Sequence, residues 1–518
     1  MDAPAPSPDE AAEKPRRGNV TRSHVRGSSL LLAGRLISLA VNFGVQVMIV
    51  RYLTKGDFGA YSYALSIVAL VQSVITFGLD RAITRFIPIY EERGEFGKIY
   101  GTIVMVAGTI AALGVTLLAF AVGLRSLIDG TLVDGAEQVT LLLLLLPLAP
   151  IQALDALQTG LFSVFSKPRA IFVRKYVIAP GLRLAAVLAV VLGNLSVNAL
   201  AVGLVLAGLI GFALYSYLLW GEIRRRGLVD RMRESVFSMP WREILTFTVP
   251  LLSSDLLYTV MNTTDAILLE RFGSADDVGA FRVILPAAQM NQVVLSSFSL
   301  LFTPMAARLF ARGDREGINQ TYWGTAIWTA VISFPIFALT FSLAQSLTVT
   351  LYEQRYEESA TYLALLSFGY FFQAALGFNG LTLKVFGLLR YIVTINLLAM
   401  VANVALNLAL IPKYGPLGAA IGTCGTLIVH NLLKQWGLRR AGVAIFEPRY
   451  AGLYGSIVAG AVGLLLVQLF ASPPFAVGFA LAAAVSLAVL LVNRRTLQVG
   501  QTFPELMRFG LVRRFLGA

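Results

Sequence analysis

The sequence predicts an all-α membrane protein in which about fourteen transmembrane helices form two related halves. Three observations predict this fold: apolar runs of membrane length recur from end to end, basic residues gather on one side of these runs, and one segment occurs twice. The chain has 518 residues, of which 57% are hydrophobic and 14% charged, and its mean hydropathy is +0.73. A run of about 20 apolar residues can cross the hydrocarbon core of a bilayer. We therefore expect a polytopic membrane protein.

The apolar runs begin after residues 1–27, which are rich in Ala, Pro, Asp and Glu, then turn basic, and are expected to form a disordered cytoplasmic tail. This tail does not resemble a signal peptide, because the first apolar run is too long and has no cleavage pattern. The expected spans are 28–50, 58–80, 99–123, 138–163, 172–193, 198–220, 244–269, 278–304, 320–345, 358–383, 388–411, 416–437, 450–471 and 475–493.

These spans divide into an N-terminal lobe (28–221) and a C-terminal lobe (244–440), each with six helices, joined by a charged cytoplasmic linker (222–243). Residues 441–495 hold two further spans. Residues 496–518 mix apolar and basic side chains, which predicts an amphipathic cytoplasmic C-terminus.

The two lobes are related by a repeat at an offset of about 220 residues, which is typical of two-lobed transporters with a site between the lobes. The link Arg51-Tyr-Leu-Thr-Lys-Gly-Asp-Phe-Gly-Ala-Tyr61 recurs in altered form as Arg271-Phe-Gly-Ser-Ala-Asp-Asp-Val-Gly-Ala-Phe281. The offset aligns Arg51 with Arg271, Gly59 with Gly279, Ala60 with Ala280, Tyr61 with Phe281, Asn42 with Asn262 and Arg35 with Asp255.

The net charge of +13 is explained by topology. If the N-terminus is cytoplasmic, most Lys and Arg residues fall in cytoplasmic segments, and this asymmetry places both termini in the cytoplasm. No compact basic domain stands apart from the spans, so nucleic acid is not an expected partner. The basic residues in the outer loops are Arg51, Lys55, Arg125, Arg271, Arg355 and Lys413.

Several kinds of chemistry lack the residues that they need. The single cysteine, Cys424, excludes a disulfide framework, and with only His24 and His430 a Cys or His metal site is not expected. The sequence contains no phosphate-binding loop of the G-x-x-x-x-G-K-[ST] type, no HExxH motif and no G-x-S-x-G with a usable histidine. We expect no enzyme activity and no cofactor.

Polar side chains form stripes on the first two helices of each repeat, where a charge near the bilayer centre costs about 2.5–3.5 kcal/mol. We interpret the stripes on spans 1, 2, 7 and 8 as the lining of a hydrated central cavity; the alternative is that these groups bond neighbouring helices in dry packing. Pro286, in span 8, is a candidate hinge. The candidate substrate-binding residues are Arg35, Asn42, Gln46, Asn262, Arg282, Gln289 and Gln292.

Other charged residues have two interpretations. Arg35 and Asp255 could pair as a latch between the lobes. Arg81 and Arg85, beside Asp80 at the cytoplasmic end of span 2, fit a gate or a membrane anchor. Asp155 and Arg183 fit either an ion pathway or buried structural pairs, and Lys384 and Lys434 fit anchors at cytoplasmic ends.

The segments Gly78-Leu-Asp-Arg-Ala-Ile-Thr-Arg-Phe86 and Tyr90-Glu-Glu-Arg-Gly94, together with the link at 51–61, resemble the Wzx-type oligosaccharide flippases of the polysaccharide transporter family. Their superfamily includes the MATE multidrug exporters and the lipid II flippase. The resemblance covers roughly residues 28–440. The additional spans 13 and 14 exceed the twelve-helix plan of many members, although the lipid II flippase also has fourteen.

This resemblance implies two six-helix lobes arranged as a V in the cytoplasmic membrane of a prokaryote. It implies alternating access, export of an undecaprenyl-pyrophosphate-linked oligosaccharide, and an H⁺ or Na⁺ gradient as the driving force. The implied partners are membrane lipids and possible polysaccharide polymerases and glycosyltransferases. Arg35 and Arg282 match the cations that would bind pyrophosphate, and Asp80, Asp255 and Asp265 are the candidates for ion coupling or a latch.

Two other functions compete with this reading. A cation-coupled multidrug exporter of the same fold would favour acidic and aromatic cavity walls, because its usual substrates are organic cations. A membrane glycosyltransferase or polymerase would need a sizeable outer loop, whereas the outer connections here are short. The mixed stripes favour an anionic substrate.

Overall fold

The computed structural model describes residues 17–125, 135–165 and 168–499, and the regular elements in these ranges are helices. Twelve of the helical segments in this part of the chain are long and apolar enough to cross a membrane. The predicted all-α membrane fold is confirmed.

The difference between twelve segments and about fourteen predicted spans has two sources. Helix α20 (Leu389–Arg440) consists of two helices that meet at a kink, where Gly415 has φ 54° and ψ −132°. Glycine adopts this backbone conformation most readily. Helix α20 therefore covers both predicted spans, 388–411 and 416–437. The predicted span 244–269 lies in α12 (Trp241–Phe272), which is not among the twelve.

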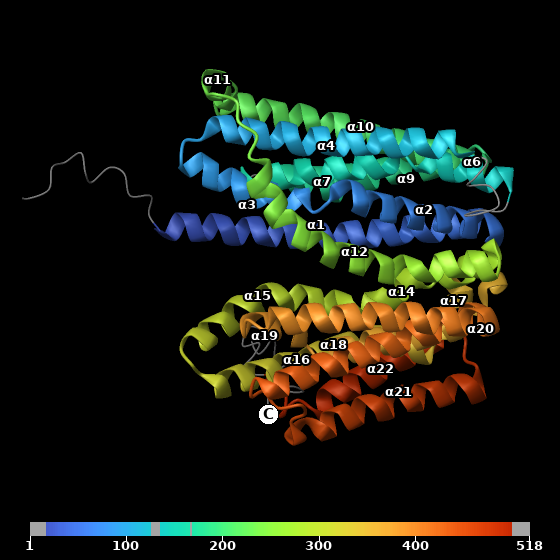
Figure 1. Ribbon diagram of the computed structural model, residues 1–518. Helices are drawn as coiled ribbons and strands as arrows, with labels where there is room; N and C mark the ends of the chain where they lie inside the picture. Colours follow the sequence, from blue (N-terminus) through green and yellow to red (C-terminus); the bar gives the residue numbers. More distant parts are fainter. Residues whose placement is uncertain (1–16, 126–134, 166–167, 500–518) are drawn as a thin grey trace, which may run out of the picture. The chain divides into compact units, whose positions relative to one another are not determined.

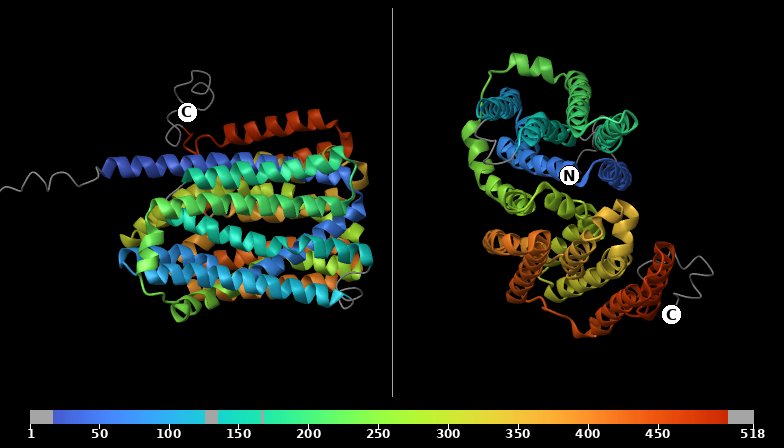
Figure 2. Two further views of the ribbon diagram at one scale, coloured as in Figure 1. Left: turned by 90° about the horizontal axis from the view of Figure 1, so that it is seen from above. Right: turned by 90° about the vertical axis from the view of Figure 1, so that its right-hand side faces the viewer.

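The chain forms two compact units. Unit 1 comprises Met1–Gln46, Val71–Gly123 and Leu143–Leu252, and unit 2 comprises Val47–Leu70, Leu124–Leu142 and Ser253–Ala518. Within each unit, long helices run alongside one another (Figures 1 and 2). Unit 1 holds all or most of α1 (Arg17–Tyr52), α3 (Leu79–Glu92), α4 (Phe96–Gly123), α7 (Leu148–Val164), α8 (Pro168–Ile171), the π-helix η1 (Phe172–Ile178), α9 (Ala179–Leu192), α10 (Val197–Arg225) and α11 (Leu228–Glu234).

Unit 2 begins with the last turn of α1. Its other elements are all or most of α2 (Lys55–Thr76), α6 (Ala136–Leu145), α12, α13 (Ala275–Arg282), α14 (Leu285–Gln289), η2 (Met290–Gln292), α15 (Val293–Ala311), α16 (Arg315–Phe337), the π-helix η3 (Ala338–Ser342), α17 (Ala344–Tyr352), η4 (Gln354–Tyr356), α18 (Ser359–Ala375), α19 (Asn379–Val385), α20, η5 (Pro448–Tyr450), α21 (Ala451–Ala471) and α22 (Phe475–Val492).

In unit 1, the segment predicted as a linker contains α11 and then packs along α4. A Cβ atom at Gly97 or at Gly101 would lie 1.9 Å from a carbonyl oxygen of this segment, that of Val236 and that of Ser238 respectively. Only glycine permits this approach. The two glycines of α4 thus leave room for the backbone of residues 236–238 to lie directly against the helix.

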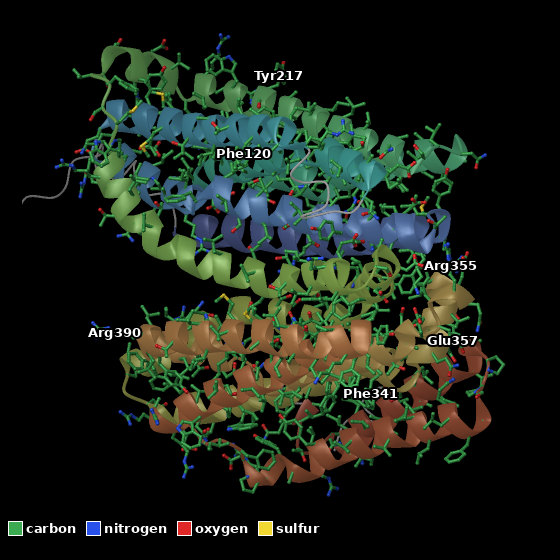
Figure 3. All side chains as sticks on the ribbon, turned by 45° about the vertical axis from the view of Figure 1, so that its right-hand side comes forward. Phe120, Tyr217, Phe341, Arg355, Glu357 and Arg390 are labelled. Carbon is green, nitrogen blue, oxygen red and sulfur yellow. The ribbon has the colours of Figure 1, made fainter. Side chains whose placement is uncertain are left out.

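In unit 2, the two C-terminal helices belong to the apolar core. Residues of α21 and α22 are buried in one cluster with α16, α18 and α20. The hydroxyl of Ser342 donates to the carbonyl of Ala461 at 2.9 Å, and that of Ser346 bonds to Gln468 at 3.1 Å. Figure 3 labels Phe341 between the ends of this unit, with Arg355 and Glu357 at one end and Arg390 at the other.

Prolines lie where the hydrogen-bonding pattern of the helices changes. The predicted span 278–304 is divided into α13, α14, η2 and α15, and Pro286 stands in the first turn of α14. The π-helix η1 leads directly into Pro180, and η3 follows Pro335. Proline lacks the N–H of a regular helix and its ring displaces a carbonyl, so the hydrogen-bonding pattern shifts there.

Candidate functional site

An ion pair inside the helices of unit 2 joins two residues that the sequence had selected. Arg282 Nη2 donates to Asp265 Oδ1 at 3.1 Å and to the carbonyl oxygen of Asn262 at 3.0 Å. The Arg282 and Asp265 side chains are 17% and 6% exposed, and Asp265 also accepts the backbone N–H of Ala266 at 2.9 Å. The charges neutralise each other where water is scarce, which is how buried charges are usually tolerated.

The turn between α12 and α13 explains why these residues meet. Ser274 caps α13 by accepting the N–H of Asp277 at 3.3 Å, and Gly273 lets the chain reverse closely beside Leu269 and Asp277. The last residue of α13 therefore returns alongside α12. One donor of the guanidinium, Nε of Arg282, is buried and has no hydrogen-bond partner among the described residues.

The two predicted glutamines reach another helix. Gln289 Nε2 bonds to the hydroxyl of Tyr370 at 3.4 Å, and Gln292 Nε2 donates to Gln373 Oε1 at 3.0 Å. Gln289 is exposed and Gln292 half-buried. Sequence reasoning missed Tyr370 and Gln373, although their spacing of three residues on α18 matches that of the glutamines and was a usable signal.

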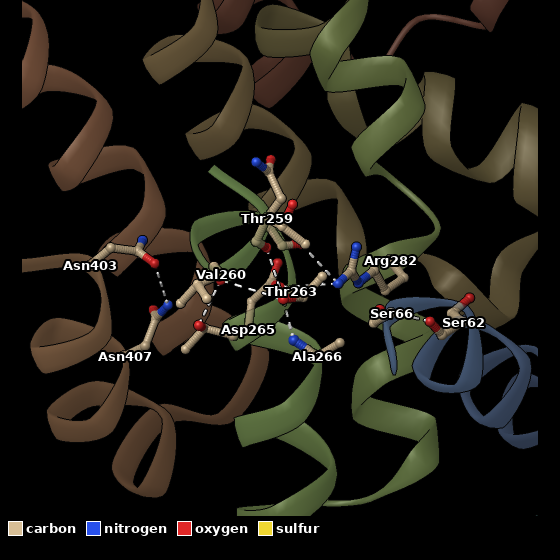
Figure 4. A network of polar contacts seen from close by, with 12 residues as sticks. Ser62, Ser66, Thr259, Val260, Thr263, Asp265, Ala266, Arg282, Asn403 and Asn407 are labelled. Atoms are coloured by element: carbon tan, nitrogen blue, oxygen red, sulfur yellow. Dashed lines mark hydrogen bonds and ion pairs between the residues drawn. The ribbon is translucent and has the colours of Figure 1, made fainter. Parts of the chain in front are cut away.

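A second missed pair lies on α20. Asn403 and Asn407 are 1% and 0% exposed, and Asn407 Nδ2 donates to Asn403 Oδ1 at 3.4 Å. Figure 4 shows them across the Val260–Asp265 stretch of α12 from Arg282. Oδ1 of Asn407 is buried without a hydrogen-bond partner in the described part of the chain. Two asparagines one turn apart in an apolar span were the available signal.

The predicted residues of α1 are less engaged. Arg35 is exposed, whereas Gln46 is half-buried. Asn42 donates to its own helix, at 2.7 Å to the carbonyl oxygen of Ser38 and at 3.1 Å to its hydroxyl. The side chain of Asp255 lies outside the described residues, so its pairing with Arg35 stays a prediction.

At the start of α3, Asp80 is half-buried while Arg81 and Arg85 are exposed. The guanidinium of Arg85 lies 4.3 Å from the ring centroid of Phe247 and 5.6 Å from that of Phe86. This cation–π contact ties α3 to the first turns of α12 within unit 1. Whether Arg81 and Arg85 act as a gate or as membrane anchors stays a prediction.

Unit 1 also contains a buried ion pair that the sequence did not assemble. Arg174, in the π-helix η1, donates through Nη2 to Asp155 Oδ1 at 2.6 Å and through Nε to the carbonyl of Gly211 at 3.1 Å. Its side chain is 7% exposed and its guanidinium lies 5.4 Å from the ring of Tyr215. Asp155 was considered as part of a buried structural pair, whereas Arg174, at the start of the predicted span 172–193, was not among the candidate residues.

These arrangements place charged and amide side chains inside the helices of each unit. Among the described residues, no group of three or more His, Cys, Asp or Glu side chains could hold a metal ion. Each unit holds one buried arginine that is paired with one carboxylate, Arg174 with Asp155 in unit 1 and Arg282 with Asp265 in unit 2. Unit 2 also holds several amide side chains.

Comparisons with known proteins agree with this architecture. The chain is 21% identical over 442 residues to an uncharacterized membrane protein of Methanocaldococcus jannaschii, covering 80% of this chain and 84% of the relative. It is 25% identical over 181 residues to the capsular polysaccharide biosynthesis protein CapF of Staphylococcus aureus, covering 35% of this chain and 46% of that protein.

Two solved structures share the fold. The lipid II flippase MurJ, in an inward closed conformation, superposes with a TM-score of 0.70 at 14% identity, covering 90% of this chain and 99% of the other. An inward-facing multidrug resistance transporter of the MATE family and MOP superfamily gives a TM-score of 0.62 at 17% identity, covering 78% and 94%. At these identities the likeness concerns the fold.

Two family models match overlapping parts of the chain. Residues 250–409 match the MatE family, and residues 24–310, more than half of the chain, match the family described as "Polysaccharide biosynthesis protein". The predicted resemblance to the polysaccharide transporter family is confirmed, and the chain belongs to the family described as "Polysaccharide biosynthesis protein".

Proposed function

We propose that this protein is a flippase that moves a polyprenyl-pyrophosphate-linked oligosaccharide across the cytoplasmic membrane of a prokaryote by alternating access. The observation that carries the proposal is the Arg282–Asp265 pair, a largely buried guanidinium that donates to one carboxylate oxygen and to the carbonyl oxygen of Asn262. Arginine suits this role because its planar fork of donors matches the oxygens of phosphate. The lipid tail can stay in the bilayer, so that only the head group needs a polar path.

The geometry supports a way to couple transport to a cation. Asp265 neutralises Arg282 while the pair is intact. A proton or Na⁺ bound at Asp265 would weaken this bond and free the guanidinium for pyrophosphate, and the unpaired Nε of Arg282 is a further donor for the same ligand. In this scheme Arg282 binds the substrate, Asp265 binds the coupling ion, and Gln289 and Gln292 contact the sugars.

The other sequence candidates keep secondary roles in the proposal. Arg35, exposed on α1, would meet the pyrophosphate, and Asn42, Gln46 and Asn262 would line the polar path. Asp80 and Asp255 remain candidates for coupling. A polymerase and glycosyltransferases of the same glycan pathway are the expected partners.

The test is a leaflet assay in proteoliposomes that contain a lipid-linked oligosaccharide, with a pH or Na⁺ gradient imposed. Wild type should move the lipid in a gradient-dependent way. Arg282→Gln and Arg35→Ala should each slow movement at least about tenfold, because each removes a charge-assisted hydrogen bond. Arg390→Gln, at an end of unit 2, is the matched control and should leave the rate unchanged. Wild type that leaves the lipid in its original leaflet under both gradients would refute the proposal.

The match of residues 250–409 to the MatE family favours a second candidate, a cation-coupled exporter of small molecules. The same vesicles decide between the two. Movement of an organic cation such as ethidium, without movement of the lipid-linked sugar, would select the exporter.

A further inference from the structure

Two lysines lie on neighbouring helices at one end of unit 2, and neither is paired with a carboxylate of the described residues. Lys434 lies near the end of α20 and Lys384 on α19, and these helices pack together. Lys384 follows Gly380 by four residues, about one turn of α19, and Gly380 is the residue against which the Lys434 side chain lies. Lys384 is exposed, whereas Lys434 is half-buried.

The side chain of Lys434 is held across the first turn of α19. A Cβ atom at Gly380 would lie 3.8 Å from Cδ and Cε of Lys434 and 3.9 Å from Nζ. Next to this contact, Asn379 Nδ2 donates to Asn431 Oδ1 at 3.2 Å, and both asparagines are buried, at 3% and 0% exposure. The buried amide pair fixes α19 against α20, so the position of the Lys434 ammonium is set by packing.

Neither lysine has an ion pair or hydrogen bond to another described residue. The acidic side chains near this end of the unit bind elsewhere: Asp314 accepts the N–H of Gly317 at 2.8 Å, Glu316 bonds to Gln320 at 3.0 Å, and Glu447 pairs with Arg449 at 3.7 Å. Other exposed residues of this end are also basic, namely Arg308, Arg312, Arg390, Arg439 and Arg440.

A simple membrane anchor would look different. An anchoring lysine extends its flexible stem so that the ammonium reaches water, whereas Lys434 is held against a neighbouring helix beside a second cation. Two like charges brought together by packing are unfavourable unless an anion lies between them. Lysine binds phosphate readily as a compact point charge with three donors.

We propose that Lys384 and Lys434 form a phosphate-binding site at the end of unit 2 that the charge distribution predicts to be cytoplasmic. The ligand is the phosphate or pyrophosphate of a lipid, since this end of a membrane helix lies at the depth of lipid head groups. A lipid-linked substrate before translocation and an anionic bilayer lipid present the same chemistry. Identification of the substrate as one source depends on the proposed function, whereas the site itself does not.

The experiment uses the full-length purified protein in neutral detergent. Its probes are geranylgeranyl pyrophosphate, the uncharged alcohol geranylgeraniol, and phosphatidylglycerol. Binding is followed by microscale thermophoresis at two salt concentrations, and the thermal stability of the free protein confirms that each variant is folded. The variants are Lys384→Gln, Lys434→Gln, the double variant and Lys384→Arg, with Arg440→Gln as the matched control from the same end of α20.

Wild type should bind the pyrophosphate more tightly than the alcohol, and the affinity should fall as salt rises. The double variant should lose at least about tenfold in affinity, because two charge-assisted contacts are removed. Lys384→Arg and Arg440→Gln should stay within about twofold of wild type. Equal binding of pyrophosphate and alcohol, or a folded double variant with wild-type affinity, would overturn the site.

The phosphatidylglycerol arm identifies the source. Tight binding of geranylgeranyl pyrophosphate that phosphatidylglycerol displaces only weakly supports the lipid-linked substrate as the ligand. Tight binding of phosphatidylglycerol that the pyrophosphate displaces only weakly supports a structural lipid. Either result supports a phosphate site. If the leaflet assay shows no translocation while the lysines still bind phosphate, the proposed function fails and this inference stands.

Discussion

Arg51 and Arg355 cap two helix ends reciprocally: Arg51 binds the end of α17, the helix before Arg355, and Arg355 binds the end of α1, the helix that contains Arg51. Arg51, at the end of α1, donates through Nε to the carbonyl oxygen of Leu351 in the last turn of α17 at 2.9 Å. Arg355 donates to the carbonyl oxygens of Val50 at 2.7 Å and Leu53 at 2.9 Å. The last carbonyls of a helix lack partners within it and carry partial negative charge, so a guanidinium is a favourable cap.

This reciprocal capping joins two parts of unit 2 that are about 300 residues apart in the sequence. Lys55 and Glu358 form an ion pair at the same end. Arg355 also lies 5.4 Å from the ring centroid of Tyr356. Burial raises the pKa of Tyr356 to about 12, so the phenol stays neutral beneath the guanidinium at physiological pH.

We predict that Arg355→Ala lowers the stability of the folded protein by about 1–3 kcal/mol, because several carbonyl groups lose a charged donor. The measurement is thermal unfolding in detergent, followed by tryptophan fluorescence. Arg51→Ala should act on the same joint, so the effects of the two substitutions should be non-additive. Arg271→Ala is the control, because Arg271 is the repeat counterpart of Arg51 and makes no hydrogen bond or ion pair with another described residue. Equal effects of Arg271→Ala and Arg355→Ala would contradict this account.

The two copies of the repeated segment contact each other at their aligned glycines. A Cβ atom at Gly59 would lie 1.7 Å from the carbonyl oxygen of Ala275, and one at Gly279 would lie 2.6 Å from that of Lys55. The repeat offset aligns Gly59 with Gly279 and Lys55 with Ala275. Each glycine therefore lies against the residue that stands four positions before the other glycine. Equivalent helices α2 and α13 thus cross at equivalent small residues.

We predict that Gly59→Ala and Gly279→Ala both destabilise the protein, and Gly59→Ala more strongly, because its Cβ would overlap a carbonyl that cannot move alone. Overpacking of this kind costs about 1–3 kcal/mol or more. Gly44→Ala, where the added Cβ has open space, should be tolerated. Size-exclusion profiles and melting temperatures compare the three variants, and a well-folded Gly59→Ala variant with an unchanged melting temperature would be inconsistent with the crossing.

The sequence was sufficient for the fold class and the repeat because both depend on patterns that extend over many residues. It aligned Gly59 with Gly279 but could not show that they touch, since contact depends on how the helices cross. The stripe on spans 7 and 8 led to Arg282 and Asp265, because the short turn between α12 and α13 brings them together. Spacing marks Tyr370 and Asn403 as members of polar pairs on their own helices, but it could not show which residues of other helices they lie against.

We predict that the Arg282–Asp265 pair can be exchanged for neutral groups without loss of stability but with loss of transport. Arg282→Gln alone leaves a buried carboxylate unpaired and should cost about 3–5 kcal/mol. The double variant Arg282→Gln, Asp265→Asn should regain most of that stability. Melting temperatures and the leaflet assay, run on the same preparations, separate the two effects. Wild-type translocation by the double variant would show that the pair has only a structural role.

The second ion pair gives a prediction about space. Gly211 on α10 leaves room for Arg174, since a Cβ there would lie 2.8 Å from Nη2 and 3.1 Å from Cζ of the guanidinium. Gly211→Ala should therefore displace Arg174 from Asp155 and lower the melting temperature by several degrees, as expected for a loss of about 1–3 kcal/mol. Gly203→Ala, on the same helix, would place its Cβ 3.4 Å from Ala186 and should have little effect. Because the shorter lysine head needs less room, Arg174→Lys should partly rescue Gly211→Ala; if it does not, the clash with the guanidinium is not the cause.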